Sequence, residues 1–221
     1  MAAEREPVVR AGLKLLDELG LDGLTLRRIA AELGVQAPTL YWRFKNKQDL
    51  IDEMATQILA DWAGEFADDG ELQTWRDWIF AFGHGLRATL LRYRDGARMV
   101  GGSYLTDSSL YGRLEATLRA FAKGGIEPAD TIFLLMTVHD FTIGFTVEQQ
   151  AVFPRPGQRE PRYALAAREA RIDADLYPFA RGVGAETFDN YDARFERGLR
   201  MIVAGFEAER RWPGPSSPGE G

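Results

Sequence analysis

The sequence predicts an all-α protein with an N-terminal three-helix head and a larger helical body. Apolar residues recur at spacings of three and four along most of the 221 residues, which is the period of a helix with one buried face. Glycine and proline separate these stretches, and no stretch shows the strict alternation of a strand. We expect a head at residues 1–47, a body at 48–211 and a disordered tail at 212–221, WPGPSSPGEG.

The head begins with a helix over residues 4–20, where Val9, Leu13 and Leu16 form an apolar stripe and Gly20 ends the helix. Thr25 can cap a second helix over 27–33, because its hydroxyl can accept a hydrogen bond from a free backbone N–H. Gly34 can take the left-handed conformation that stops this helix.

A third helix is expected over residues 38–47. Pro38 is suited to a helix start, and Leu40 and Phe44, four apart, would face back toward the second helix. The opposite face is aromatic and basic, which is the arrangement that a helix–turn–helix needs to enter a DNA major groove. An ordinary αα-hairpin with an exposed face is the alternative. For Arg5 and Arg10 on the first helix, phosphate contact and plain solvation are equally good interpretations.

The body is expected to continue with a helix over 46–66, capped by Asn46 and Asp49, which would act as a lever between body and head. A polar break at 67–71 follows. Further helices are expected over 75–93, within 94–102, and over 110–122 and 128–150, and 163–180 is expected to be partly helical. The last helix is expected over 186–211. Its wide apolar stripe from Phe188 to Phe206, beside 132–145, suits a dimeric four-helix bundle or, alternatively, an intramolecular core.

Charge and composition exclude several classes of protein. The chain has 27 basic and 33 acidic residues, but residues 1–47 are net +2 and the remainder is net −8, which suits a protein that touches DNA with one small surface. Without cysteine it has no disulfide, zinc-thiolate site or cysteine nucleophile. No stretch approaches a membrane span and the N-terminus is charged, so we expect a cytoplasmic protein without a membrane partner.

Two runs in the head, LTLRRIAAELGV and PTLYWRFKNKQDLIDEM, resemble the tetracycline repressor family of bacterial transcription regulators. In the body, LLRYRDGARM, LEATLRAFAKGG and FTIGFTVEQQ are similar to the ligand-binding core of members that respond to tetracycline, and the resemblance fades after Pro154. It implies a regulator, usually a repressor, that binds a palindromic operator as a homodimer and responds to a small molecule. The DNA-binding residues it implies are Arg27, Arg28, Ala37, Pro38, Thr39, Tyr41, Trp42, Arg43, Lys45 and Lys47.

The chain departs from these members where they read DNA and where they bind the drug. Leu26, Ala37 and Arg43 replace a threonine, a glutamine and a histidine, so the operator should differ. In those members the drug arrives as a magnesium chelate, but the matching polar positions here are Ala63, Phe82, Val100 and Thr117, and only the carboxylate of Glu148 remains. We therefore expect no metal, no cofactor and a mostly apolar or aromatic effector. The expected ligand-binding residues are Trp62, Phe82, Leu86, Val100, Ser103, Tyr104, Thr117, Leu135, His139 and Glu148.

Two other classes of function are less well supported by the sequence. An enzyme would need partners for the carboxylates of Asp140 and Glu148, and no nucleophile, metal cluster or phosphate loop accompanies them. A helical small-molecule-binding protein without operator function is the third possibility. His84 and His139 are better explained as satisfied core histidines than by contact with a ligand.

Overall fold

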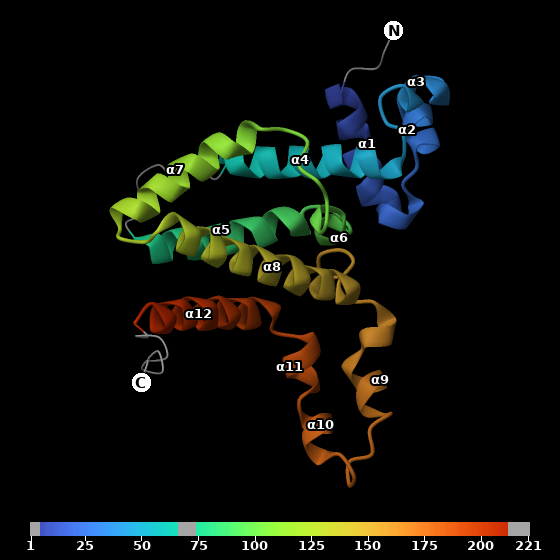
Figure 1. The fold of residues 1–221 in the computed structure, drawn as a ribbon. Helices are drawn as coiled ribbons and strands as arrows, with labels where there is room; N and C mark the ends of the chain where they lie inside the picture. The colour runs from blue at the N-terminus through green and yellow to red at the C-terminus, as the bar shows by residue number, and fades with distance from the viewer. Residues whose placement is uncertain (1–4, 66–73, 212–221) are drawn as a thin grey trace, which may run out of the picture.

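The computed structural model describes residues 5–65 and 74–211, and every regular element in these ranges is helical, which confirms the all-α fold (Figure 1). The head contains α1 (Arg5–Gly23), α2 (Leu26–Glu32) and α3 (Ala37–Tyr41), and α4 (Lys47–Glu65) runs from the head into the body. The body is built from α5 (Trp75–Leu91), α6 (Gly96–Val100), α7 (Ser109–Lys123), α8 (Pro128–Val152) and α12 (Tyr191–Arg210). The predicted break at 67–71 and the predicted tail lie outside the described residues.

Between α8 and α12 the chain forms an arm that projects from the body (Figure 1). The arm consists of the short helices η1 (Pro161–Tyr163), α9 (Leu165–Glu169), α10 (Pro178–Gly182) and α11 (Gly184–Phe188). The expectation of partial helix here is confirmed, but Pro178 begins a helix rather than interrupting one, because a proline in the first turn needs no N–H partner.

The first helix is broken at Gly20 but does not end there. Gly20 has φ 72° and ψ 171°, and one more helical turn follows to Gly23. Beyond this break, the Leu21 N–H donates 2.9 Å to the carboxylate of Asp95, which lies at the start of α6. The predicted break at Gly20 is therefore confirmed, but the sequence of the head alone does not reveal the extra turn to Gly23 or the side chain of the body that binds the Leu21 N–H.

The second helix begins and ends as its sequence predicts. The Thr25 hydroxyl accepts from the Arg28 N–H at 3.2 Å. At the other end Gly34 has φ 65°, and the N–H groups of Gly34 and Val35 donate to the carbonyls of Ala31 and Ala30 at 3.1 and 2.9 Å. This double capping pattern turns the chain sharply toward α3.

The third helix is shorter than expected and ends at Tyr41 instead of residue 47. Leu40 and Phe44 are both buried, as predicted, and this holds the chain in a turn after α3. Asn46 and Asp49 then start α4: the Asn46 side chain accepts from the Asp49 N–H at 3.0 Å, and the Asp49 carboxylate accepts from the Lys45 N–H at 2.8 Å. These polar side chains end the third helix early because they favour a new helix start.

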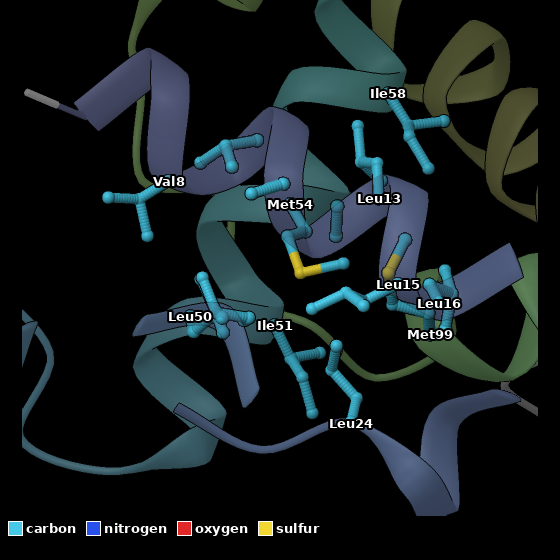
Figure 2. Close-up of a cluster of buried hydrophobic side chains, with 14 of the residues drawn as sticks. Val8, Leu13, Leu15, Leu16, Leu24, Leu50, Ile51, Met54, Ile58 and Met99 are labelled. Carbon is cyan, nitrogen blue, oxygen red and sulfur yellow. The ribbon is translucent and has the colours of Figure 1, made fainter. Parts of the chain in front are cut away.

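Head and body share one hydrophobic core. Figure 2 shows Met99, from α6, beside Leu15 and Leu16 of α1, with Ile51 and Met54 of α4 in the same cluster. All five side chains are at most 8% exposed. Because these side chains are in close packing, a rigid displacement of α6 would also displace side chains of α1 and α4.

The central helix of the body is α8, which packs on α5, α6, α7 and α12. By length and composition alone it is apolar enough to span a membrane, with a mean hydropathy of 1.2, so the expectation that no stretch approaches a membrane span was wrong for α8. Its contacts with four helices account for part of this composition, because 33% of the apolar window is buried, whereas Phe133 remains exposed. Gly83 of α5 allows the close packing, because a Cβ there would lie 2.9 Å from Leu199 and 3.3 Å from Val138.

The last helix begins at Tyr191, five residues later than predicted, after Asn190 in the left-handed conformation. Phe188 belongs to α11 and contacts Tyr163 of the arm, so it does not extend the stripe of α12. That stripe, from Tyr191 to Phe206, is buried within the chain against α5 and α8. The intramolecular alternative is therefore correct for this face.

Candidate DNA-binding surface and ligand cavity

The outer surface of α3 and of the turn after it is aromatic and accessible. Trp42 is 91% exposed and Tyr41 is 53% exposed, although aromatic side chains are usually largely buried. Pro38 and Arg43 are exposed beside them, while Ala37 and Thr39 are half-buried. Each of these positions was expected to contact DNA, and together they form one surface of the head.

The basic side chains of the head divide into paired and unpaired groups. In the described part of the chain, Arg27, Arg43 and Lys45 are exposed and form no side-chain hydrogen bond or ion pair. Lys47 instead donates to the Leu21 carbonyl at 2.6 Å, and Arg28 donates to the Gly23 carbonyl at 3.0 Å. The cations that are available to phosphate without rearrangement are therefore the three unpaired ones.

Three other cations of the head are already neutralised. Lys14 pairs with Glu32 at 2.6 Å, and this hydrogen bond raises the pKa of Lys14. Arg10 pairs with Glu6, and Arg5 pairs with Glu53 of α4. These pairings favour a structural role for Arg5 and Arg10 over phosphate contact.

Gln36 is a candidate DNA-binding residue that sequence reasoning missed. It occupies the N-cap of α3, is exposed, and makes no side-chain capping hydrogen bond. A free amide beside a recognition helix can pair with an adenine edge. Its position directly before Ala37 and Pro38, two expected DNA-binding residues, could have identified it from the sequence.

The head is fastened to the body at the break in α1. The Asp17 carbonyl accepts 2.7 Å from Arg155, in the loop after α8, and the Asp17 carboxylate accepts 3.2 Å from the Arg94 N–H. In an unbroken helix the Asp17 carbonyl would bind the Leu21 N–H, which here donates to Asp95. Groups freed by the break in α1 are thus bound by residues of the body.

A cavity of about 360 Å³ lies among α4, α5, α7 and α8. Trp62, Trp78 and Phe82 form its aromatic wall: Phe82 stacks on Trp78 with centroids 5.3 Å apart and meets Trp62 edge-on at 5.2 Å. The remaining lining is mainly aliphatic. Its size and apolar character are those of a small-molecule site.

The structure brings five of the ten expected ligand-binding residues to this cavity: Trp62, Phe82, Thr117, Leu135 and His139. The other five lie elsewhere. Leu86 and Val100 are buried in the shared core, Ser103 and Tyr104 line a separate hollow between α4 and α6, and Glu148 is exposed on α8.

Several lining residues were not predicted. Leu105, Leu110, Arg113, Leu114 and Met136 come from α7, its approach and α8. Trp78 could have been found from its spacing of four from Phe82, whereas the α7 residues become neighbours of α4 only through the tertiary fold.

Neither histidine is a fully buried core residue. His84 lies on the surface and pairs with Glu196 of α12 at 2.8 Å, and its ring packs edge-on against Phe195. His139 lines the cavity, and its Nδ1 lies 3.0 Å from the Asp140 carboxylate.

The cavity does not fit a magnesium chelate. His139 is the only nitrogen ligand of the described lining, Glu148 is not part of the lining, and no carboxylate lines the described part of the cavity. Magnesium prefers several oxygen ligands, usually carboxylates. Among residues 5–65 and 74–211 there is also no cluster of three His, Asp or Glu side chains.

Comparison with known proteins agrees with this architecture. Residues 8–54 match the family model of bacterial regulatory proteins of the tetR family, and residues 68–210 match that of the tetracyclin repressor-like C-terminal domain. The tetracycline repressor protein class A from transposon 1721 of Escherichia coli is 38% identical over 209 residues, covering 92% of this chain and 90% of that protein.

Two solved structures are similar over nearly the whole chain. A possible TetR family transcriptional regulator from Streptomyces coelicolor A3(2) has a TM-score of 0.78 at 33% identity, covering 93% of this chain and all of that one. TetR-Q116A from Acinetobacter baumannii AYE, in complex with minocycline, has a TM-score of 0.70 at 30% identity, covering 95% and 99%. The helix–turn–helix head, the helical body with its cavity and these matches show that the chain belongs to the tetracycline repressor family of bacterial transcription regulators.

Proposed function

We propose that this protein is a repressor that binds a palindromic operator as a homodimer and leaves it when a metal-free, mostly apolar or aromatic effector enters the α4–α5–α7–α8 cavity. The observation that carries the proposal is the combination of an unpaired aromatic and basic surface on the head with an apolar cavity bounded by α4, the helix that joins head to body. The members of the family are ligand-responsive regulators rather than enzymes. Because its operator lies on chromosomal or plasmid DNA, we place the protein in the cytoplasm.

The proposed DNA contacts follow from the geometry of the head. Pro38 and Thr39 are suited to thymine methyl groups, and Arg27 is suited to a bidentate contact with guanine. Tyr41, Trp42, Arg43 and Lys45 flank them and are suited to phosphates. Lys47 and Arg28 would join them only after giving up their carbonyl partners.

The dimer contact is proposed to use the outer faces of α8 and α12. On α12, Met201 is 67% exposed, and Ala204 and Gly205 continue the same face. On α8, Phe133 is 60% exposed. In Figure 1, α12 lies on the side of α8 that faces away from α4, so these two helices are accessible to a second copy. Two helices from each subunit would form a four-helix bundle.

The effector is proposed to act through α4. Leu59, Trp62 and Ala63 of α4 line the cavity, and the opposite end of α4 packs in the head. A ligand that binds one orientation of α4 better than another shifts the population of head spacings, and couplings of about 1–3 kcal/mol are typical.

The proposal is tested by selecting operator sequences from a random duplex library and measuring binding of the dimer by fluorescence anisotropy. We expect a palindromic sequence, and we expect Arg27→Ala to weaken its binding by about 1–3 kcal/mol while binding to random DNA changes little. If the wild-type protein binds no duplex in any effector-free buffer, this proposal is wrong. The alternative, a small-molecule-binding protein without operator function, would then be favoured. Tetracycline titration with and without magnesium checks the metal-free cavity, and tight magnesium-dependent binding would contradict it.

A further inference from the structure

We propose that the effector is a planar aromatic molecule that carries an anionic group, and that Arg113 binds this group at the mouth of the cavity. The inference rests on the proposed function, since it concerns the same cavity, and it adds a residue and a charge to it. The anionic group is a carboxylate, sulfonate or phenolate oxygen, since each of these accepts hydrogen bonds from a guanidinium.

The charges of the lining have one sign. Among the described residues that line the cavity, the ionisable side chains are Arg113 and His139, and none is acidic. The nearest acid to the His139 ring on its own helix is Asp140, which is bound to Nδ1 of that ring and is not part of the lining. A cationic ligand would therefore lose its hydration without gaining a carboxylate, whereas an anionic ligand meets a cation.

Arg113 is free to bind a ligand. Its side chain is exposed and forms no hydrogen bond or ion pair with any residue in the described ranges, while its backbone belongs to α7 and its carbonyl accepts from the Thr117 hydroxyl at 3.1 Å. On the same helix Arg119 is held by Glu115 at 2.7 Å and lies outside the cavity lining. Of the two arginines of α7, Arg113 can therefore bind an incoming anion without first breaking an ion pair, whereas Arg119 cannot.

The walls of the cavity indicate the shape of the apolar part of the ligand. The rings of Trp78 and Phe82 are within 18° of parallel and form a flat surface, with the Trp62 ring edge-on to Phe82. Stacking on such a surface favours a planar ring system. Arg113 and His139 belong to α7 and α8, helices that pack on each other and are joined by residues 124–127, so two walls present polar groups to a ligand held against the aromatic side chains.

The test uses two fluorescent probes with one anilinonaphthalene skeleton, 1-anilinonaphthalene-8-sulfonate and the neutral N-phenyl-1-naphthylamine. Binding is measured on the full-length dimer by energy transfer from tryptophan to the probe. We expect Arg113→Gln to weaken sulfonate binding about fivefold or more and to change binding of the neutral probe less than twofold, because the variant removes the charge but little of the apolar surface. Arg113→Lys should restore part of the sulfonate affinity, and raising the salt concentration should weaken sulfonate binding to the wild type but not to Arg113→Gln.

Arg119→Gln is the matched control, because it removes a charge from the same helix outside the cavity; it should leave both probes unaffected. Ala120→Phe, which fills the exposed edge of the lining, should weaken both probes. Thermal unfolding followed by circular dichroism verifies that each variant is folded.

The outcomes separate the two proposals. If Ala120→Phe is folded and weakens neither probe, the cavity is not a ligand site, and the proposed function fails together with the inference. If Ala120→Phe weakens both probes but Arg113→Gln affects them equally, or neither, the cavity binds ligands without regard to charge, and only the inference is overturned.

Discussion

At the scale of single residues, the head separates cations that hold the fold from cations left for a partner. Lys14 and Lys47 are held by Glu32 and by the Leu21 carbonyl. The Lys45 ammonium group, in contrast, forms no hydrogen bond or ion pair in the described part of the chain. Binding to DNA releases counterions from each phosphate that a free cation neutralises, so the salt dependence of binding counts the cations used.

We therefore expect Lys45→Ala to weaken binding to operator and random duplexes alike, and to reduce the slope of log affinity against log salt by about one per subunit. Lys14→Ala is the control and should leave the slope unchanged. Anisotropy titrations at several salt concentrations measure this. An unchanged slope in Lys45→Ala would show that the side chain does not reach phosphate.

Packing at single residues is also testable, and Gly83 of α5 is one such position. A Cβ there would lie 2.9 and 3.1 Å from the methyl groups of the fully buried Leu199, so we expect Gly83→Ala to destabilise the fold by up to about 2 kcal/mol, because the cost of overpacking exceeds the gain of about 1 kcal/mol in helix propensity. Gly64, in α4, has nothing within 4 Å of its Cβ position, so Gly64→Ala should be neutral or stabilising by up to about 1 kcal/mol through helix propensity. Urea unfolding of the two variants compares them, and equal stabilities would rule out a tight α5–α12 contact.

At the scale of elements, the break in α1 replaces a bond within one helix by bonds between head and body. Gly20 makes this possible because it tolerates φ 72°, and Leu21 and Asp17 then bind Asp95 and Arg155. The head is thus attached to the body by α4 and also by α1.

We expect Gly20→Ala to loosen this attachment, because its Cβ would meet the Asp95 carboxylate at 2.9 Å and Arg94 Nε at 3.1 Å, and alanine disfavours positive φ. Exchange of the Leu21 amide hydrogen, followed by NMR, should accelerate about tenfold or more. Gly34→Ala has the same conformational cost at φ 65° with nothing within 4 Å, and it should leave the Leu21 amide protected. Equal protection of the Leu21 amide in wild type and Gly20→Ala would show that the break in α1 does not attach the head to the body.

At the scale of the whole molecule, operator binding requires two heads at a fixed separation, and this separation depends on the dimer contact. The inner stripe of α12 is buried in the core of its own subunit. We therefore propose that the dimer contact uses the exposed outer face around Met201. In this proposal, dimerisation and folding use different faces of one helix.

We expect Met201→Glu to leave the monomer folded but to weaken dimerisation, because it places a carboxylate in an apolar contact against its own copy across the two-fold axis. Sedimentation equilibrium should show a rise in the dimer dissociation constant of about tenfold or more, with a parallel loss of operator affinity. Tyr111→Glu places the same charge on an exposed aromatic position of α7 and should remain dimeric. A dimer as tight as wild type in Met201→Glu would move the contact elsewhere.

Local chemistry determined much of this fold from the sequence. The Thr25 cap, the left-handed Gly34, the burial of Leu40 and Phe44 and the helical body all follow from residues within a few positions of each other, because caps, turns and helical periodicity are local. The exposed aromatic and basic surface of the head followed from the same patterns.

Only the tertiary structure decided the rest. It showed what binds the chain after the break at Gly20: the Leu21 N–H donates to Asp95, 74 positions away in the chain. It showed which apolar face of α12 is buried, and it divided the expected ligand-binding residues between the cavity, the shared core and the surface. Sequence periodicity identifies a buried face but not what covers it, because contacts between distant helices depend on how the whole chain packs.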